Sequence, residues 1–156
     1  MFPTEIRVYV LSKTKEREVF ATIDMVEDYF CSDLPSRTPP GRFNIPSDQI
    51  IFKKGALILF QYAERKDEEK IVAHALLKSD GCVYVPGNDY YIGYYQLDIK
   101  SINVYRNPVT KDEIFGIWKK KLLQAKLNLD VSKYDDYLNL LKKKNNLTSR
   151  CIKKTD

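Results

Sequence analysis

Two acidic residues and a lysine come closest to a catalytic pattern in this chain. Glu68 and Lys70 stand two positions apart, as in the Glu-x-Lys half of a nuclease metal site, and Asp80 follows Lys70. Such a site needs the acid and the lysine on a strand, beside a second carboxylate at the metal. Here the pair lies in a run of mostly charged residues, which favours a solvated hairpin turn. A metal-dependent hydrolase using Glu68 and Asp80 is therefore our third hypothesis, after two binding functions.

Other residues suited to catalysis are few. The single histidine, His74, lies in an apolar run, and a lone strand histidine is more typical of a hydrogen-bonded structural residue than of a metal ligand. Cys31, Cys82 and Cys151 form no CxxC pair, which favours reduced thiols in a cytoplasmic protein. The chain has no Gly-rich phosphate loop, GxSxG elbow or HExxH motif. We therefore predict a binding module with no catalytic residue, metal or cofactor, and not an enzyme.

Arginines beside an aromatic residue indicate a different chemistry in residues 31–48. Four prolines and a glycine exclude regular structure there, and a loop this long in a compact domain is functional or mobile. Arg37 and Arg42, with Phe43 and Asn44 alongside, suit phosphate contact and base stacking. In the alternative interpretation, Phe43 pins the loop to the core while the arginines are solvated.

Four tyrosines lie close together in residues 90–95. In a strand, Tyr91 and Tyr95 face one side of the sheet, and Tyr90 and Tyr94 face the other. If one pair is in the core, the other points to water or to a ligand, where tyrosine offers a stacking face and a hydrogen-bonding tip. The alternative is that helices cover both faces of the strand.

The positive charge belongs to the C-terminal third of the chain. Residues 111–156 contain 12 Lys/Arg and 6 Asp/Glu, a net +6, whereas residues 1–110 contain 14 and 15, a net −1. Lys119, Lys120 and Lys121 crowd the middle of a predicted helix there. A basic patch suits a polyanionic partner, usually nucleic acid. A solvated helix face with a disordered tail explains the same charge equally well.

The elements that must position these residues form a sheet-rich fold. Four short runs in residues 55–105, rich in β-branched and aromatic residues, predict successive strands of a mostly antiparallel sheet or small barrel. A strand over residues 5–11 and an amphipathic helix over residues 15–30 precede them. Asn107 and Pro108 are expected to end the sheet.

Two helices are expected after the sheet. Thr110 and Glu113 form a capping-box signature for the first, and Asp130 or Ser132 caps the second. We predict an α+β fold with a single domain over residues 1–144, followed by a basic, disordered tail over residues 145–156.

Residues 42–110 resemble the PUA-like superfamily and, within it, the EVE-type domains. The residues that carry the resemblance are Arg42-Phe43-x-Ile-Pro46, Lys54-Gly-Ala-Leu-Ile-Leu-Phe-Gln-Tyr62, Ile71-Val-Ala-His-Ala-Leu-Leu77, Tyr94-Tyr-Gln-Leu-Asp98, Val104-Tyr105 and Asn107-Pro-Val-Thr110. The resemblance implies a small mixed β-barrel, flanked by helices, that binds nucleic acid. EVE-like members include readers of modified bases, some attached to restriction nucleases.

The resemblance also implies roles for particular residues. A flipped base needs an aromatic to stack on, polar groups for its edge, and Arg or Lys to hold the flanking phosphates. The stacking candidates are Tyr62, Tyr91 and Tyr94. The candidates for the base edge are His74 and Asn44, and those for phosphates are Arg37, Arg42, Lys119, Lys120 and Lys121.

Two binding functions remain open. The first is a non-catalytic, cytoplasmic nucleic-acid-binding domain, for DNA or RNA, that recognises a modified or flipped base in a restriction or defence setting, with a nuclease subunit as a candidate protein partner. The second is a protein-interaction or subunit domain with a Tyr-rich interface. A membrane partner is not expected, because no apolar run approaches the roughly 20 residues of a membrane span and the N-terminus lacks a signal-peptide pattern.

Overall fold

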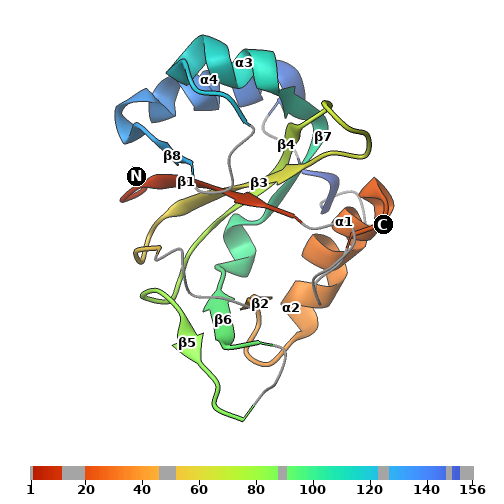
Figure 1. Ribbon diagram of the computed structural model, residues 1–156, viewed down its shortest axis with the longest axis vertical. Coiled ribbons are helices and arrows are strands. Elements are labelled where there is room, and N and C mark those ends of the chain that lie inside the picture. Colours follow the sequence, from red (N-terminus) through yellow and green to blue (C-terminus); the bar gives the residue numbers. More distant parts are fainter. Residues whose placement is uncertain are drawn as a thin grey trace.

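The computed structural model of this chain describes residues 2–11, 20–45, 52–87, 91–122, 127–146 and 149–151. This part of the chain has an α+β fold with a five-stranded and a three-stranded sheet (Figure 1). The larger sheet contains, in spatial order, β7 (Asn103–Thr110), β4 (Lys70–Leu76), β3 (Leu57–Tyr62), β1 (Ile6–Val10) and β8 (Asn128–Leu129). The smaller sheet contains β2 (Arg42–Ile45), β6 (Gly93–Gln96) and β5 (Val83–Tyr84). Both sheets are open, so the described strands form no closed barrel.

Strand pairing is mostly antiparallel, as predicted. The exception is β1, which runs parallel to β3 with Val8 opposite Leu59. All six residues of β3 are buried, because both faces of the larger sheet are covered. A strand covered on both faces needs a continuous apolar run, which is what the sequence Leu-Ile-Leu-Phe of β3 provides.

The helices cover the two faces of the larger sheet. The helices are α1 (Ile23–Asp28), which continues through a π-helical segment (Tyr29–Asp33) into α2 (Leu34–Ser36), α3 (Lys111–Trp118) and α4 (Tyr134–Asn145). In Figure 1, α3 and α4 lie on one side of this sheet, and α1, α2 and the smaller sheet lie on the other. Two hydrophobic cores result, one on each side, with Phe30 and Phe60 in the first and Tyr137 and Leu59 in the second.

The predicted start of the first C-terminal helix is confirmed. The Thr110 side chain accepts the Glu113 backbone N–H at 3.2 Å, and the Glu113 carboxylate accepts the Thr110 N–H at 3.0 Å, so the capping box is present. Asp130 caps a short 3-10 helix (Val131–Lys133) that leads directly into α4, with its carboxylate accepting the Ser132 N–H.

The expected end of the sheet at Asn107 and Pro108 is wrong, because β7 continues to Thr110. β7 is an edge strand, and an edge strand tolerates a proline because it needs backbone donors on one side only. The side chain of Asn145 on α4 fixes the exposed edge, since it accepts the Asn107 N–H at 2.7 Å and donates to the Asn107 carbonyl at 3.1 Å.

The segment after the first helix is more regular than its prolines suggest. Instead of an irregular stretch over residues 31–48, the helix runs on to Ser36 and β2 begins at Arg42. Pro35 lies within the first turn of α2, where the missing N–H has no cost. The start of the predicted helix over residues 15–30 lies partly outside the described residues, and α1 begins at Ile23.

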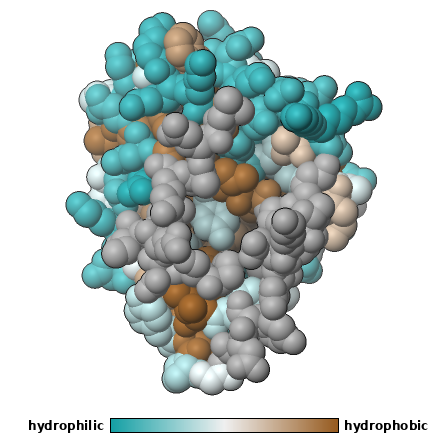
Figure 2. Space-filling model, in the orientation of Figure 1, coloured by the Kyte–Doolittle hydropathy of each residue, from teal (hydrophilic) through white to brown (hydrophobic). Residues whose placement is uncertain are grey.

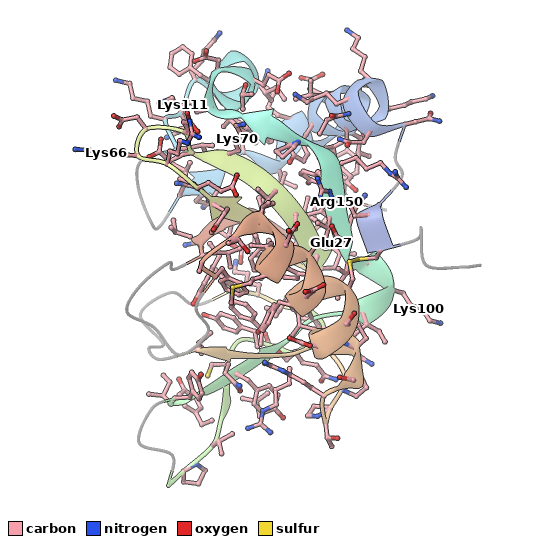
Figure 3. The ribbon with its side chains drawn as sticks, turned by 90° about the vertical axis from the view of Figure 1, so that its right-hand side faces the viewer. Glu27, Lys66, Lys70, Lys100, Lys111 and Arg150 are labelled. Carbon is pink, nitrogen blue, oxygen red and sulfur yellow. A yellow bond between two sulfur atoms is a disulfide. The ribbon has the colours of Figure 1, made fainter. Side chains whose placement is uncertain are left out.

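The cysteines and the C-terminal tail also differ from expectation. A disulfide joins Cys31 to Cys151, so the prediction of reduced thiols is wrong for this pair (Figure 3). Arg150 forms an ion pair with Glu27 at 2.8 Å beside it. The Val104 N–H donates to the hydroxyl of Ser149. Residues 149–151 are therefore part of the fold and not of a disordered tail, whereas residues 147–148 and 152–156 lie outside the described residues. Sequence spacing does not indicate a pair 120 residues apart.

We expect Gly41→Ala to destabilise the fold by at least about 2 kcal/mol. Gly41 has φ +85°, and a Cβ there would collide with the Leu97 carbonyl oxygen. Gly116 in α3 is a matched control, because a Cβ there meets nothing within 4 Å and alanine favours a helix by up to about 1 kcal/mol. Urea denaturation of Gly41→Ala and Gly116→Ala measures both effects. Equal stabilities for the two variants would contradict this packing at Gly41.

Candidate functional site

The two sheets meet at one joint, where Leu77, just after β4, pairs with Leu97, just after β6. The backbone groups around this joint are bonded to one another. The Lys78 N–H donates to the Gln96 carbonyl at 2.7 Å, and the Asp98 N–H donates to the Leu76 carbonyl at 2.8 Å. The joint therefore has little freedom to move, and it fixes the positions of the side chains that project from it.

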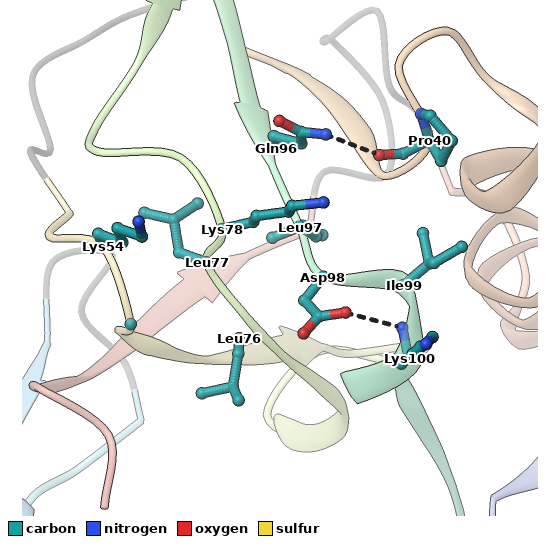
Figure 4. A pocket seen from close by; sticks show the side chains of 11 residues that line it. Pro40, Lys54, Leu76, Leu77, Lys78, Gln96, Leu97, Asp98, Ile99 and Lys100 are labelled. Carbon is teal, nitrogen blue, oxygen red and sulfur yellow. Dashed lines mark hydrogen bonds between the residues drawn. The ribbon is translucent and has the colours of Figure 1, made fainter.

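A pocket of about 580 Å³ opens at this joint (Figure 4). Its lining includes Leu76, Leu77 and Leu97, and its polar side chains come from Lys54, Lys78, Gln96, Asp98 and Lys100. Three lysines and one aspartate give the lining a net charge of +2. A concave, positively charged pocket of this size suits a phosphate-bearing ligand.

The three lysines are exposed, and the one acid near them is already engaged. A carboxylate oxygen of Asp98 accepts the Lys100 backbone N–H at 3.0 Å, as the cap of the 3-10 helix Ile99–Ser101. The described residues show no salt bridge from Lys54, Lys78 or Lys100 to a carboxylate. Their charge is therefore directed to solvent and available to an anion.

The smaller sheet presents a polar face beside this pocket. In the sheet register, Arg42 lies opposite Gln96 and Asn44 lies opposite Tyr94, so all four side chains share one face. The Arg42 guanidinium lies over the Tyr94 ring, with its carbon 4.6 Å from the ring centre, and its Nε donates to the Asn44 Oδ1 at 3.1 Å. We call these four residues the open face.

Gln96 belongs to both the open face and the pocket. Its side chain donates to the Pro40 carbonyl at 3.4 Å on the pocket rim (Figure 4). The open face and the lysine pocket therefore form one continuous surface.

Arg37 has a structural position in this arrangement. Its guanidinium stacks over the Tyr29 ring at 4.8 Å and donates to the backbone carbonyl of Arg42 at 2.9 Å. It thus fixes the start of β2, and we regard it as supporting Arg42 more than contacting a ligand itself.

Two predicted stacking residues are in the core. Phe43 is 2% exposed and packs against Tyr9 and Phe60, so the alternative interpretation of Phe43 as an anchor is the right one. Tyr62 is also 2% exposed, and its hydroxyl donates to the Phe20 carbonyl. Neither ring can receive a base in this structure. Of the tyrosines in residues 90–95, Tyr95 is buried, Tyr94 lies on the open face, Tyr91 is partly exposed before β6, and Tyr90 lies outside the described residues.

His74 lies away from the open face and participates in a structural network. Its Nδ1 is 2.6 Å from the Tyr105 hydroxyl, which is 2.9 Å from the Tyr137 hydroxyl on α4. Burial lowers the pKa of His74 to about 4, so the ring is neutral. Burial also raises the pKa of Tyr105. The register of β4 shifts between Ile71 and Ala73, and this irregularity breaks the simple alternation expected for the strand.

The lysine triplet of α3 is far from the open face. Lys119, Lys120 and Lys121 are exposed at and just after the end of α3, and Lys119 lies over the Phe115 ring. In Figure 1, α3 and the smaller sheet occupy opposite ends of the molecule. Figure 2 shows hydrophilic side chains over the α3 and α4 end. The structure therefore does not place this triplet in one site with Arg42 and Tyr94.

The pocket lysines were missed by sequence reasoning. Lys54, Lys78 and Lys100 stand singly beside strand ends, with no motif around any of them. Only the sheet topology brings these ends together, because the joint at Leu77 and Leu97 is between segments that are not consecutive strands.

The hypothesis of a metal-dependent hydrolase gains no support. Glu68 lies in the turn before β4, where it lines a small hollow with Glu64 and Lys70, whereas Asp80 lies in the bend after β4. Within the described ranges, no group of three or more His, Cys, Asp or Glu side chains is placed to hold a metal ion. The same ranges contain no helix of the length and apolarity that a membrane crossing requires.

No protein-family model matches the chain, and no curated protein matches its sequence significantly.

We expect the stability of the protein to depend on His74 below pH 6.5. The pKa of His74 is about 4 in the folded protein and 6.5 in its ordinary state, so the unfolded chain takes up a proton that the folded ring does not. This stability is complete above pH 6.5 and is lost as the pH falls from about 6.5 to about 4, by at most about 3 kcal/mol.

Urea denaturation at neutral pH and at about pH 4.5 tests this dependence on His74. The control is His74→Gln, which keeps a hydrogen-bonding side chain but does not titrate. The wild-type protein should lose more stability on acidification than the variant. The same loss in both proteins would show that other groups, such as the carboxylates, account for the pH dependence.

Proposed function

We propose that this protein is a non-catalytic nucleic-acid-binding domain whose interface is the open face and the adjoining lysine pocket. One observation carries the proposal: an Arg-covered tyrosine and three lysines from separate segments lie on one surface, joined through Gln96. Arg and Lys hold phosphates, while an aromatic ring or an Arg plane stacks on a base. Both kinds of group are present here side by side.

The charge distribution supports the proposal. Residues 1–110 have a net charge of −1, yet Arg42 and the three pocket lysines all come from this part of the chain. Positive residues that gather on one surface attract a polyanion to that surface, even where the region as a whole has a slightly negative charge. The Asp98 carboxylate accepts the Lys100 backbone N–H and offsets one of the three lysine charges, so the pocket lining keeps a net charge of +2.

The kind of base recognised and the protein partner are predicted from the sequence alone. Recognition of a modified or flipped base in a restriction setting, with a nuclease subunit as partner, comes from the resemblance to EVE-type domains. A PUA-like fold remains part of that proposal. A cytoplasmic location also stays a prediction, and the Cys31–Cys151 disulfide removes the cysteine argument for it.

We expect replacement of Lys54, Lys78 and Lys100 together by alanine to weaken nucleic-acid binding and to flatten its salt dependence. Removal of each lysine–phosphate contact should reduce the steepness of log K against log salt by about 0.7 to 0.9. Fluorescence anisotropy with labelled oligonucleotides, at several salt concentrations, measures both affinity and slope.

The matched control is the triple replacement of Lys119, Lys120 and Lys121 by alanine. It removes the same charge from the opposite end of the molecule, so it should leave the slope nearly unchanged. If the α3 triplet variant loses binding and the pocket variant does not, the interface is at α3 and the proposed surface is wrong.

A further inference from the structure

We infer that the ligand of this surface is a single strand of nucleic acid, with one base on the Arg42–Tyr94 stack and the neighbouring phosphate in the lysine pocket. This inference rests on the proposed function and narrows its substrate class. DNA and RNA share the chemistry on which it depends, so the experiment includes both.

The open face presents a flat group to a ligand. The Arg42 guanidinium carbon lies 4.6 Å from the centre of the Tyr94 ring, so two planar groups, a guanidinium and an aromatic ring, lie together there. Bases in a duplex are stacked on one another and offer only their edges in the grooves. A flat cation–aromatic stack can contact the face of a base only if that base is unpaired.

The two other side chains of the open face are the carboxamides of Asn44 and Gln96. The Asn44 Oδ1 accepts from Arg42 and the Gln96 nitrogen donates to Pro40, so the Gln96 oxygen is the group that can accept a hydrogen bond from the edge of a base. The open face therefore suits sequence-tolerant contact with a base that is exposed on both its face and its edge.

The stack and the pocket lie next to each other along β6. Tyr94 and Gln96 are two residues apart on β6, which corresponds to about 7 Å along a strand. The Lys78 backbone is bonded to the Gln96 carbonyl at 2.7 Å, so the pocket begins where the open face ends. A base on the stack and a phosphate of the same strand in the pocket would therefore be near neighbours along the strand.

The pocket is concave, is lined by leucines and lysines, and has a volume of about 580 Å³. A duplex is read by a helix or β-ribbon that protrudes into its groove. A flexible single strand can bend its backbone into a concavity and lay a base on the adjacent face, which a stiff duplex cannot do. The shape of the pocket therefore favours the single strand.

The experiment compares binding of the whole protein to fluorescent DNA and RNA oligomers of equal length, as single strands and as blunt duplexes, at low and moderate salt. We expect single strands to bind at least about tenfold more tightly than duplexes of the same length. Tyr94→Ala should weaken single-strand binding by about 5- to 100-fold, the range typical of alanine substitution at one stacked base.

Two further variants separate stacking from loss of structure. Tyr94→Phe keeps the ring and should bind nearly as well as the wild-type protein. Tyr84→Ala removes an exposed tyrosine of the same sheet, opposite Gly93 and so on the other face from Tyr94, and should have little effect. Loss of binding in both Tyr94→Phe and Tyr84→Ala would overturn the stacking role of Tyr94.

The outcomes distinguish this inference from the proposed function. Equal affinity for duplex and single strand, unchanged in Tyr94→Ala, would overturn the single-strand inference but would leave nucleic-acid binding in place. Absence of binding to every probe at low salt would overturn both. Tighter binding of single strands than of duplexes would support the inference. The nucleic acid whose single strand binds more tightly, RNA or DNA, would then be identified as the ligand.

Discussion

The pairing of Leu77 with Leu97 is the constraint on which the rest of the site depends. It joins the backbones of the two sheets, whose side chains also meet where Phe43 packs against Phe60. The backbone bonds around the joint hold the same geometry, including that from the Leu97 N–H to the Gly41 carbonyl at 2.9 Å. Backbone groups bonded in this way cannot move independently, because each would leave a buried partner unsatisfied. The joint therefore places the open face of the smaller sheet beside the lysine pocket, so that the two form one continuous surface.

Both faces of the larger sheet are buried, which explains why the proposed binding surface lies outside it, on the smaller sheet. Side chains of β3 point alternately into the two cores, and the polar groups near those cores are used for structure, as in the chain from His74 through Tyr105 to Tyr137. The smaller sheet is different, because Phe43, Ile45 and Tyr95 on one of its faces are buried, whereas the residues of the open face are partly exposed. Its other face retains Arg42 and Tyr94 for a ligand, which is the usual division of an antiparallel sheet between core and solvent.

Local patterns predicted the elements of this fold, but long-range contacts determined the site. The capping box at Thr110 and the strand of β3 follow from short-range chemistry, so they were found from sequence. The burial of Phe43 and the disulfide of Cys31 with Cys151 depend on which segments become neighbours, which spacing does not encode. The proposed role of Lys78 also depends on a long-range contact, because only the fold brings it beside Gln96. Arg42 and Asn44 were identified by their residue types and Tyr94 by alternation along its strand, whereas their common face follows from the pairing of β2 with β6, which was not predicted.

The most direct test of the interface is a titration of isotope-labelled protein with a short single-stranded oligonucleotide, followed by the backbone amide signals in NMR spectra. We predict that the largest shifts lie in β2, in β6 and around the joint from Leu76 to Ser79, with small changes in α3 and α4. Shifts concentrated in α3, or confined to the Cys151 end of the chain, would contradict the proposed interface and would place the ligand on another part of the molecule.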